Sequence, residues 1–281
     1  MTDSAPPPVS SLDPRLAQVL NLLQTGQTGE AMEQADKLAV LIELKRPARA
    51  FYALAAAMDN EQEKAMAALA EFPTPSDLDN GEALLSVGSA WFRLGEPGTA
   101  IPFLYRARRG HEKHPMIAAR LGACLLAAGR IPEALPMLEQ AVELLPNSGG
   151  AWLNLARVYL AVGEAAKALG ALDMAASLPD KDQRLYMMSH MEALSSLERH
   201  DEAELLMRQA AESGEQGATA ALVHMLGARG KHDEAWHLLK DSLETKPDDT
   251  AHGTRCRVGT GARPLWRSGP LAEAGNRETA G

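Results

Sequence analysis

A glycine, an alanine and a leucine recur together in this chain at a fixed spacing of 34 positions. In each copy the alanine follows the glycine by five positions, and the leucine follows the alanine by four. Three consecutive copies keep this phase: Gly95, Ala100 and Leu104; Gly129, Ala134 and Leu138; Gly163, Ala168 and Leu172. A repeat of this length predicts a solenoid, because one such segment cannot bury its own apolar face and must stack against the next.

Each repeat has the pattern of two helices. Residues 115–148 show one apolar face before Gly129 and a second apolar face after it, both at helical spacing. Gly129 is suited to end the first helix, since glycine adopts the left-handed conformation at little cost. Aromatic residues make up only 4% of the chain, while alanine and leucine, the best helix formers, dominate. The fold class is therefore expected to be all-α.

The repeats resemble the tetratricopeptide repeat, whose pattern is W-x2-L-G-x2-Y, then A-x3-F, then P. The copy at 149–182 carries the matching residues Trp152, Leu155, Ala156, Tyr159, Ala168, Leu172 and, one position early, Pro179. The resemblance implies a right-handed α-solenoid of stacked helix-turn-helix repeats. It also implies that the first helix of each repeat, helix A, lines a concave groove.

The domain organisation follows from the same signature. The best copies span 81–114, 115–148 and 149–182, and weaker copies extend the array to about seven repeats over 12–249. In the second and sixth repeats Asn60 and Glu198 replace the turn glycine. Residues 1–11, which include three consecutive prolines, are expected to form a flexible leader. Residues 250–281 are either an irregular Gly/Arg-rich tail or a degenerate eighth repeat.

Composition and charge exclude several function classes. The net charge is −9, from 28 basic and 37 acidic residues, whereas a nucleic-acid or acidic-membrane binder needs a basic face. Two cysteines, Cys124 and Cys256, cannot build a disulfide framework or a four-cysteine zinc site. The N-terminal sequence has no secretory pattern, and no apolar run reaches the ~20 residues of a membrane span. A cytoplasmic location is expected.

No motif in the sequence predicts catalysis, a metal or a cofactor. His111 to His114 reads HEKH, which lacks the four-residue histidine spacing of the H-E-x-x-H zinc motif. The glycine pair in 259–269 has no preceding strand pattern, so it does not fit a phosphate loop. Cys124 lies on an apolar helix face and is expected to be a buried, unreactive thiol. We therefore expect a protein that is not an enzyme.

The resemblance places a peptide-binding groove on helix A of the central repeats. Repeat positions 2, 5, 6, 9, 12 and 13 tend to face the groove in this family. The candidate groove residues at these positions are Arg93, Met116, Arg120, Leu126, Leu153, Asn154, Arg157 and Leu160, with Phe92 next to Arg93. Arginine can bind a carboxylate through two parallel hydrogen bonds, and asparagine can bind an extended backbone. The residues of the chaperone-binding carboxylate clamp are absent, apart from Asn154.

These observations predict a non-catalytic scaffold for protein–protein interaction. Its partner would be another protein, contributing a peptide or helix that carries an acidic residue flanked by apolar ones. The alternative is that the chain is the repeat-containing N-terminal part of an enzyme, such as a sulfotransferase or glycosyltransferase, without its catalytic domain. The sequence does not indicate the oligomeric state or the pathway.

Overall fold

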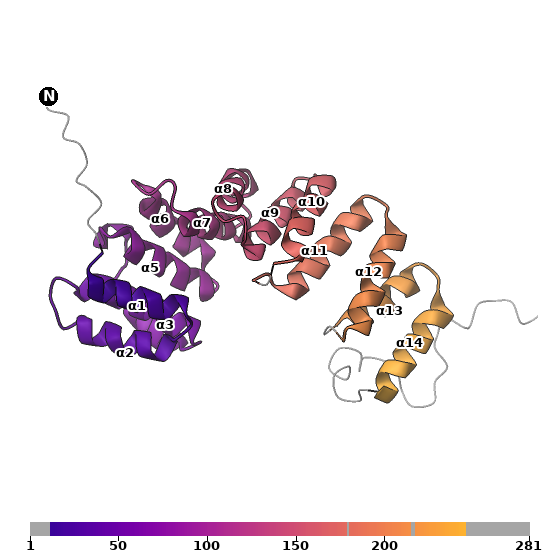
Figure 1. Ribbon diagram of the computed structural model, residues 1–281, viewed down its shortest axis with the longest axis horizontal. Coiled ribbons are helices and arrows are strands. Elements are labelled where there is room, and N and C mark those ends of the chain that lie inside the picture. Colours follow the sequence, from indigo (N-terminus) through magenta and orange to yellow (C-terminus); the bar gives the residue numbers. More distant parts are fainter. Residues whose placement is uncertain (1–11, 179, 215–216, 246–281) are drawn as a thin grey trace, which may run out of the picture. The chain divides into compact units, whose positions relative to one another are not determined.

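A computed structural model describes residues 12–178, 180–214 and 217–245. These residues form α-helices joined by short turns, with one 3-10 turn at Pro75–Asp77 and no strand, which confirms the expected all-α class (Figure 1). The leader 1–11, Pro179 and the segment 250–281 with Cys256 lie outside the described residues. The helices are α1 (Pro14–Gln24), α2 (Thr28–Leu38), α3 (Lys45–Met58), α4 (Gln62–Leu69), α5 (Gly81–Arg93), α6 (Pro97–Arg108), α7 (Pro115–Ala127), α8 (Ile131–Leu144), α9 (Gly149–Ala161), α10 (Ala165–Ala176), α11 (Gln183–Ser196), α12 (His200–Glu212), α13 (Ala218–Ala228) and α14 (His232–Thr245).

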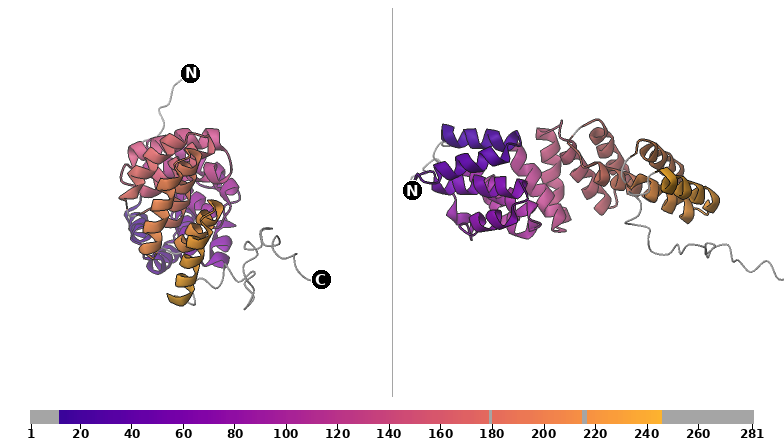
Figure 2. Two further views of the ribbon diagram at one scale, coloured as in Figure 1. Left: turned by 90° about the vertical axis from the view of Figure 1, so that its right-hand side faces the viewer. Right: turned by 90° about the horizontal axis from the view of Figure 1, so that it is seen from below.

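The chain divides into two compact units, and the division falls in the turn of the sixth repeat. Unit 1 extends through Arg199, and unit 2 begins at His200. In unit 1 the hairpins α1–α2, α3–α4, α5–α6, α7–α8 and α9–α10 follow one another in chain order (Figure 2). Within unit 1 each odd-numbered helix from α1 to α9 also packs against the next odd-numbered helix, so the A helices of successive repeats are neighbours there. In unit 2, α13 packs against both α12 and α14.

The turn inside each repeat depends on one residue in the left-handed conformation. Positive φ occurs at every predicted turn position: Gly26 (77°), Asn60 (59°), Gly95 (82°), Gly129 (72°), Gly163 (81°), Glu198 (57°) and Gly230 (75°). The residue that follows donates its N–H to a carbonyl five positions earlier, as from Arg130 to Leu125 at 2.8 Å and from Arg199 to Leu194 at 2.9 Å. This bond closes a Schellman motif, which satisfies carbonyl groups at the helix end.

We expect Glu198→Gly to stabilise the protein by about 0.5–1 kcal/mol, since a left-handed non-glycine residue costs roughly 1–2 kcal/mol and glycine loses more chain entropy on folding. The gain at Asn60→Gly should be smaller, because asparagine tolerates this conformation. Glu198→Ala is the matched control, since it removes the charge and keeps the Cβ atom. Thermal melting would measure all three, and an equal gain in the alanine and glycine variants would contradict the conformational explanation.

Small residues allow the two helices of a hairpin to approach closely. A Cβ atom added to Gly122 on α7 would lie 2.6 Å from Cγ of Leu138 on α8, closer than real carbon contacts permit. Ala134 and Leu138 are both 0% exposed, and so are Ala168 and Leu172 one repeat later. The repeated alanine and leucine therefore form the contact that holds α7 to α8 and α9 to α10.

Substituting the repeated alanine should disrupt this contact. We expect Ala134→Arg or Ala168→Arg to cost several kcal/mol, roughly 3 or more, because a long charged side chain would be overpacked and unpaired there. Ala127→Arg, at an exposed position on α7, is the control and should melt within a few degrees of the parent. Unchanged melting of both buried-site variants would show that the helix-pair register is wrong.

Unit 2 contains a buried carboxylate held by three cations. Glu204 on α12 is 7% exposed, and its carboxylate accepts hydrogen bonds from Arg208 at 2.8 Å and from Lys231 at 2.8 and 2.9 Å. Arg229 donates to the same carboxylate. Hydrogen bonds from Lys231 and then Arg208 lower the pKa of Glu204 from 4.5 to about 2. The cluster thus ties α12 to the end of α13 and to the turn before α14.

The lowered pKa gives the cluster a defined pH dependence. Its stabilisation is complete above the ordinary pKa of 4.5 and is lost as the pH falls toward the folded-state value of about 2. At pH 7 we expect Glu204→Gln to destabilise unit 2 by about 2 kcal/mol, a value reduced for the partial exposure of the three cations.

Melting of the parent and of Glu204→Gln should be compared between pH 7 and pH 3. The difference in melting temperature should shrink toward pH 3, because Glu204 becomes protonated in the unfolded parent while it stays largely ionised in the folded one. Glu212→Gln, at an exposed position on the same helix, should show no such effect. A difference that is as large at pH 3 as at pH 7 would rule out the charge of Glu204 as its cause.

Candidate ligand-binding face

The predicted site residues lie on three neighbouring A helices of unit 1. Arg93 ends α5, Arg120 lies in the middle of α7, and Arg157 lies in α9. Because α7 packs against both α5 and α9, the fold brings these helices together although they are 34 residues apart in sequence. We call the surface formed by Phe92, Arg93, Met116, Arg120, Leu126, Asn154, Arg157 and Leu160 the A-helix face.

Arg120 is the most unusual residue of the A-helix face. Its Nε atom is buried and has no hydrogen-bond acceptor among the residues that the structure describes. Its guanidinium lies over the ring of Phe92, with Cζ 5.5 Å from the ring centroid. Desolvation by burial lowers the pKa of Arg120, and the positive charge of Arg93 lowers it further. The surroundings therefore disfavour the charge that Arg120 carries.

No carboxylate within the described ranges of the chain forms an ion pair with Arg93, Arg120 or Arg157. Arginines elsewhere in unit 1 do find acidic partners: Arg49 lies 2.8 Å from Glu71, and Arg106 lies 3.1 Å from Asp79. On the A-helix face the nearest comparable contact is neutral, since Arg157 donates to Asn154 Oδ1 at 3.3 Å. The positive charge of this face is thus left without a protein counter-charge.

The apolar residues predicted to line the groove differ in how much of their side chains is exposed. Met116 is 45% exposed, and Leu126 and Leu160 are half-buried, so these three can contact a ligand. Leu153 is only 3% exposed, and the prediction that it contacts a ligand is corrected here. Leu153 packs into the protein because α9 is covered on more than one side, by α7, α8, α10 and α11.

The closeness of Arg93 to Arg120 was not predicted from the sequence. The prediction grouped Arg120 with Arg157 and Asn154, whereas the charge that acts on Arg120 is that of Arg93. Phe92 is the signal that could have indicated this arrangement, because an aromatic ring beside one arginine attracts a second guanidinium.

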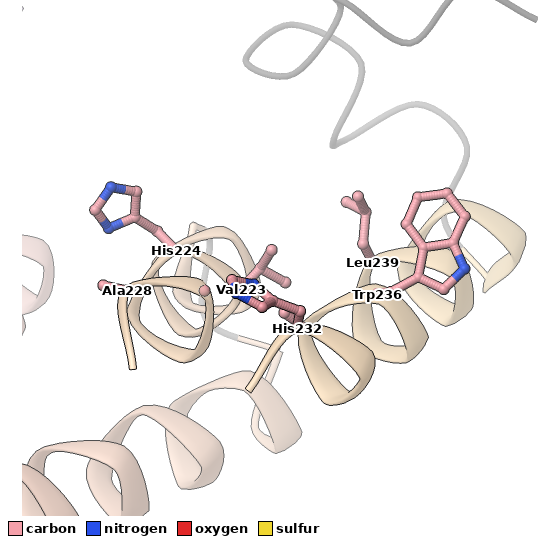
Figure 3. A pocket seen from close by; sticks show the side chains of 8 residues that line it. Val223, His224, Ala228, His232, Trp236 and Leu239 are labelled. Atoms are coloured by element: carbon pink, nitrogen blue, oxygen red, sulfur yellow. The ribbon is translucent and has the colours of Figure 1, made fainter. Parts of the chain in front are cut away.

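A second candidate surface lies in unit 2 and was not predicted. A groove of about 450 Å³ is lined by Val223, His224, Gly227, Ala228, His232, Ala235, Trp236 and Leu239. Trp236 and Leu239 project from the same side of α14, and Val223 and His224 belong to α13 (Figure 3). Trp236 is 41% exposed. The sequence signal was the tryptophan directly after the repeated alanine, where the central repeats have isoleucine or leucine.

The HEKH segment serves a structural purpose. The Nδ1 atom of His114 accepts a hydrogen bond from the N–H of Ile117 at 3.4 Å and so caps the start of α7, while its Nε2 atom lies 3.1 Å from Glu82. In the described part of the chain no three His, Cys, Asp or Glu residues are placed to hold a metal ion. None of the described helices combines the length and hydropathy needed to cross a membrane.

Cys124 is buried, and burial raises the pKa of its thiol to about 12. At neutral pH it is therefore a protonated, unreactive side chain, as its position on an apolar helix face predicted.

The family model of the tetratricopeptide repeat matches residues 125–189, which include most of the copy at 115–148 and all of the copy at 149–182. Together with the paired helices and the left-handed turn residues, this match decides the family. The chain contains tetratricopeptide repeats. The resemblance proposed from the sequence is thus confirmed.

Comparison with known proteins supports the family and the fold of this tetratricopeptide-repeat protein. A 125-residue stretch is 27% identical to the TPR repeat-containing thioredoxin TTL4 of Arabidopsis thaliana. That stretch covers 44% of this chain and 17% of the relative. The structure of Pseudomonas aeruginosa PilF superposes with a TM-score of 0.55 at 20% identity, covering 71% of this chain and 90% of PilF. A MamA double mutant gives a TM-score of 0.51 at 20% identity, covering 59% and 94%.

Proposed function

We propose that this tetratricopeptide-repeat protein is a non-catalytic scaffold that binds a peptide or helix of another protein on its A-helix face. Tetratricopeptide repeats generally mediate protein–protein interactions, which supports the general role. The observation that carries the specific proposal is Arg120, a desolvated guanidinium that has no carboxylate partner among the described residues and lies next to a second positive charge.

The chemistry of Arg120 indicates what the ligand brings. An ionised group that is removed from water without a partner is costly, and an incoming anion removes that cost. A carboxylate suits a guanidinium best, because the two form parallel hydrogen bonds in one plane. The ligand therefore carries an aspartate, a glutamate or a terminal carboxylate that reaches Arg93 and Arg120.

The surroundings of the two arginines indicate the neighbours of that acidic group. Met116 exposes nearly half of its surface on the same helix as Arg120. Leu126 and Leu160 are half-buried on α7 and α9. These side chains favour apolar residues on either side of the acidic one, and Asn154 can bond the ligand backbone.

The proposal can be tested without knowing the natural partner. A random-peptide phage library selected against the full chain should yield peptides with an acidic residue flanked by apolar ones. We expect Arg93→Glu and Arg120→Glu each to weaken the selected peptides at least about 30-fold, since truncating one member of a close charge pair in an interface costs roughly 2 kcal/mol or more. Titration calorimetry would measure the affinities.

Two controls separate binding from folding. Arg93 is exposed, so its substitution should leave the melting temperature unchanged even if Arg120→Glu lowers it. Arg109→Glu changes an equally exposed arginine just after α6, outside the A-helix face, and should bind like the parent. Peptides without acidic residues, or equal affinity for the parent and Arg93→Glu, would place the binding surface elsewhere.

One observation favours a second candidate function. The Arabidopsis relative combines repeats with a thioredoxin by name, and the match spans 17% of its length. The repeats of this chain could then serve as the partner-binding part of a longer enzyme. Sequencing the genomic reading frame beyond Gly281 tests this candidate, which requires a continuous coding sequence with strand–loop–helix patterns.

A further inference from the structure

The residue directly after the repeated alanine occupies the same sequence position in each repeat. In the third and fifth repeats this residue is Ile101, 4% exposed, and Leu169, 8% exposed. Ile101 belongs to the same core cluster as Ala118 and Leu121 of α7, the next A helix. In these repeats the second helix is thus covered by the first helix of the next repeat, as α6 is by α7 and α10 by α11. In the second repeat, where α4 and α5 are not among the packed helix pairs, Met66 at the same place is 48% exposed.

In the seventh repeat this place is filled by Trp236 and is not covered. Trp236 is 41% exposed, and it borders the groove of about 450 Å³ between α13 and α14 (Figure 3). The partly exposed Leu239 corresponds to Leu138 and Leu172, which are 0% exposed. No helix beyond α14 falls within the described ranges of the chain. The groove therefore lies where the first helix of a following repeat would pack, and it can bind another segment there.

We propose that residues 263–274 of the same chain dock in the groove between α13 and α14 and cap the last repeat. This segment reads RPLWRSGPLAEA and contains Leu265, Trp266 and Leu271. Trp266 would pack against Trp236, where an offset or edge-to-face arrangement of two aromatic rings adds to the burial of apolar surface. Solenoids need such a cap to shield the exposed face of their terminal repeat.

The length of the connection allows this docking. Residues 246–265 join the end of α14 to Trp266, and twenty extended residues span up to about 70 Å. The fourteen residues of α14 measure only about 21 Å along the helix axis. The segment can therefore return to any part of the groove. Because it is tethered, its effective concentration near the groove is of the order of millimolar, which favours it over a free partner.

Charge complementarity supports the same occupant. Residues 200–245 contain nine acidic and four basic residues, so this part of unit 2 is acidic. Residues 251–281 contain five arginines and two glutamates. Arg263 and Arg267 flank the apolar pair Leu265 and Trp266, so the segment combines the apolar side chains that the groove needs with the charge that its surroundings attract.

A double-mutant cycle in the full chain tests the proposal. Amide hydrogen exchange in α13 and α14 would be measured for the parent, Trp236→Ala, Trp266→Ala and the double variant. We expect Trp266→Ala to lower protection in α14 about tenfold, the effect of uncovering a large aromatic contact. In the Trp236→Ala background the same change should have little further effect, since residues in contact are not additive.

The control is Leu205→Ala, which changes a 56% exposed residue of α12 that does not line the groove. In that background Trp266→Ala should keep its full effect. Unchanged protection in Trp266→Ala, or simple additivity of the two tryptophan variants, would overturn the proposal. So would protection of α13 and α14 that rises with protein concentration, because the occupant would then be a second copy of the chain. Each of these outcomes leaves the A-helix face and its peptide binding unaffected.

Discussion

The structure depends on the close approach of two helices around a small residue. Leu138 on α8 rests where a side chain at Gly122 would stand, and Ala134 removes the bulk that would otherwise separate α8 from α7. Close packing of this kind is short-ranged, so it fixes the relative position of the two helices tightly. Once a hairpin has this geometry, its outer surface is defined, and the next hairpin can stack on it. The A-helix face, the candidate ligand-binding surface, is a consequence, because stacking of the hairpins of unit 1 aligns the first helix of each hairpin with its neighbours.

Much of this architecture could be predicted from the sequence. The turn positions were identified from a glycine and an alanine five residues apart, and the two exceptions, Asn60 and Glu198, adopt the same left-handed conformation as the glycines. The prediction succeeds because the turn is local and involves only residues close in sequence. The candidate site was less predictable, because the orientation of a long side chain depends on its neighbours in space. The charge of Arg93, which belongs to a different repeat, contributes to lowering the pKa of Arg120. The side chain of Leu153 is buried in the protein.

One position shows how a single place in a repeat can serve different purposes. The residue after the repeated alanine is an apolar core residue at Ile101 and Leu169, a buried carboxylate at Glu204 and a half-exposed ring at Trp236. At Glu204 three cations compensate the burial of the charge. Periodicity alone predicts a core residue at all four positions. These two departures lie next to the boundary between the units and next to the end of the described helices. Met66, at the same place in the second repeat, is 48% exposed and departs as well.

The unpaired charge of Arg120 has a consequence for how much of this protein a cell can hold. A chain with a partly buried cation that has no acidic partner among the described residues is least stable when it is alone. A bound anion adds stability in proportion to the logarithm of its concentration. Quality control degrades proteins according to the fraction that is unfolded. If the proposed partner supplies that anion, the steady-state amount of the protein would follow the supply of the partner, and copies made in excess of it would be removed first.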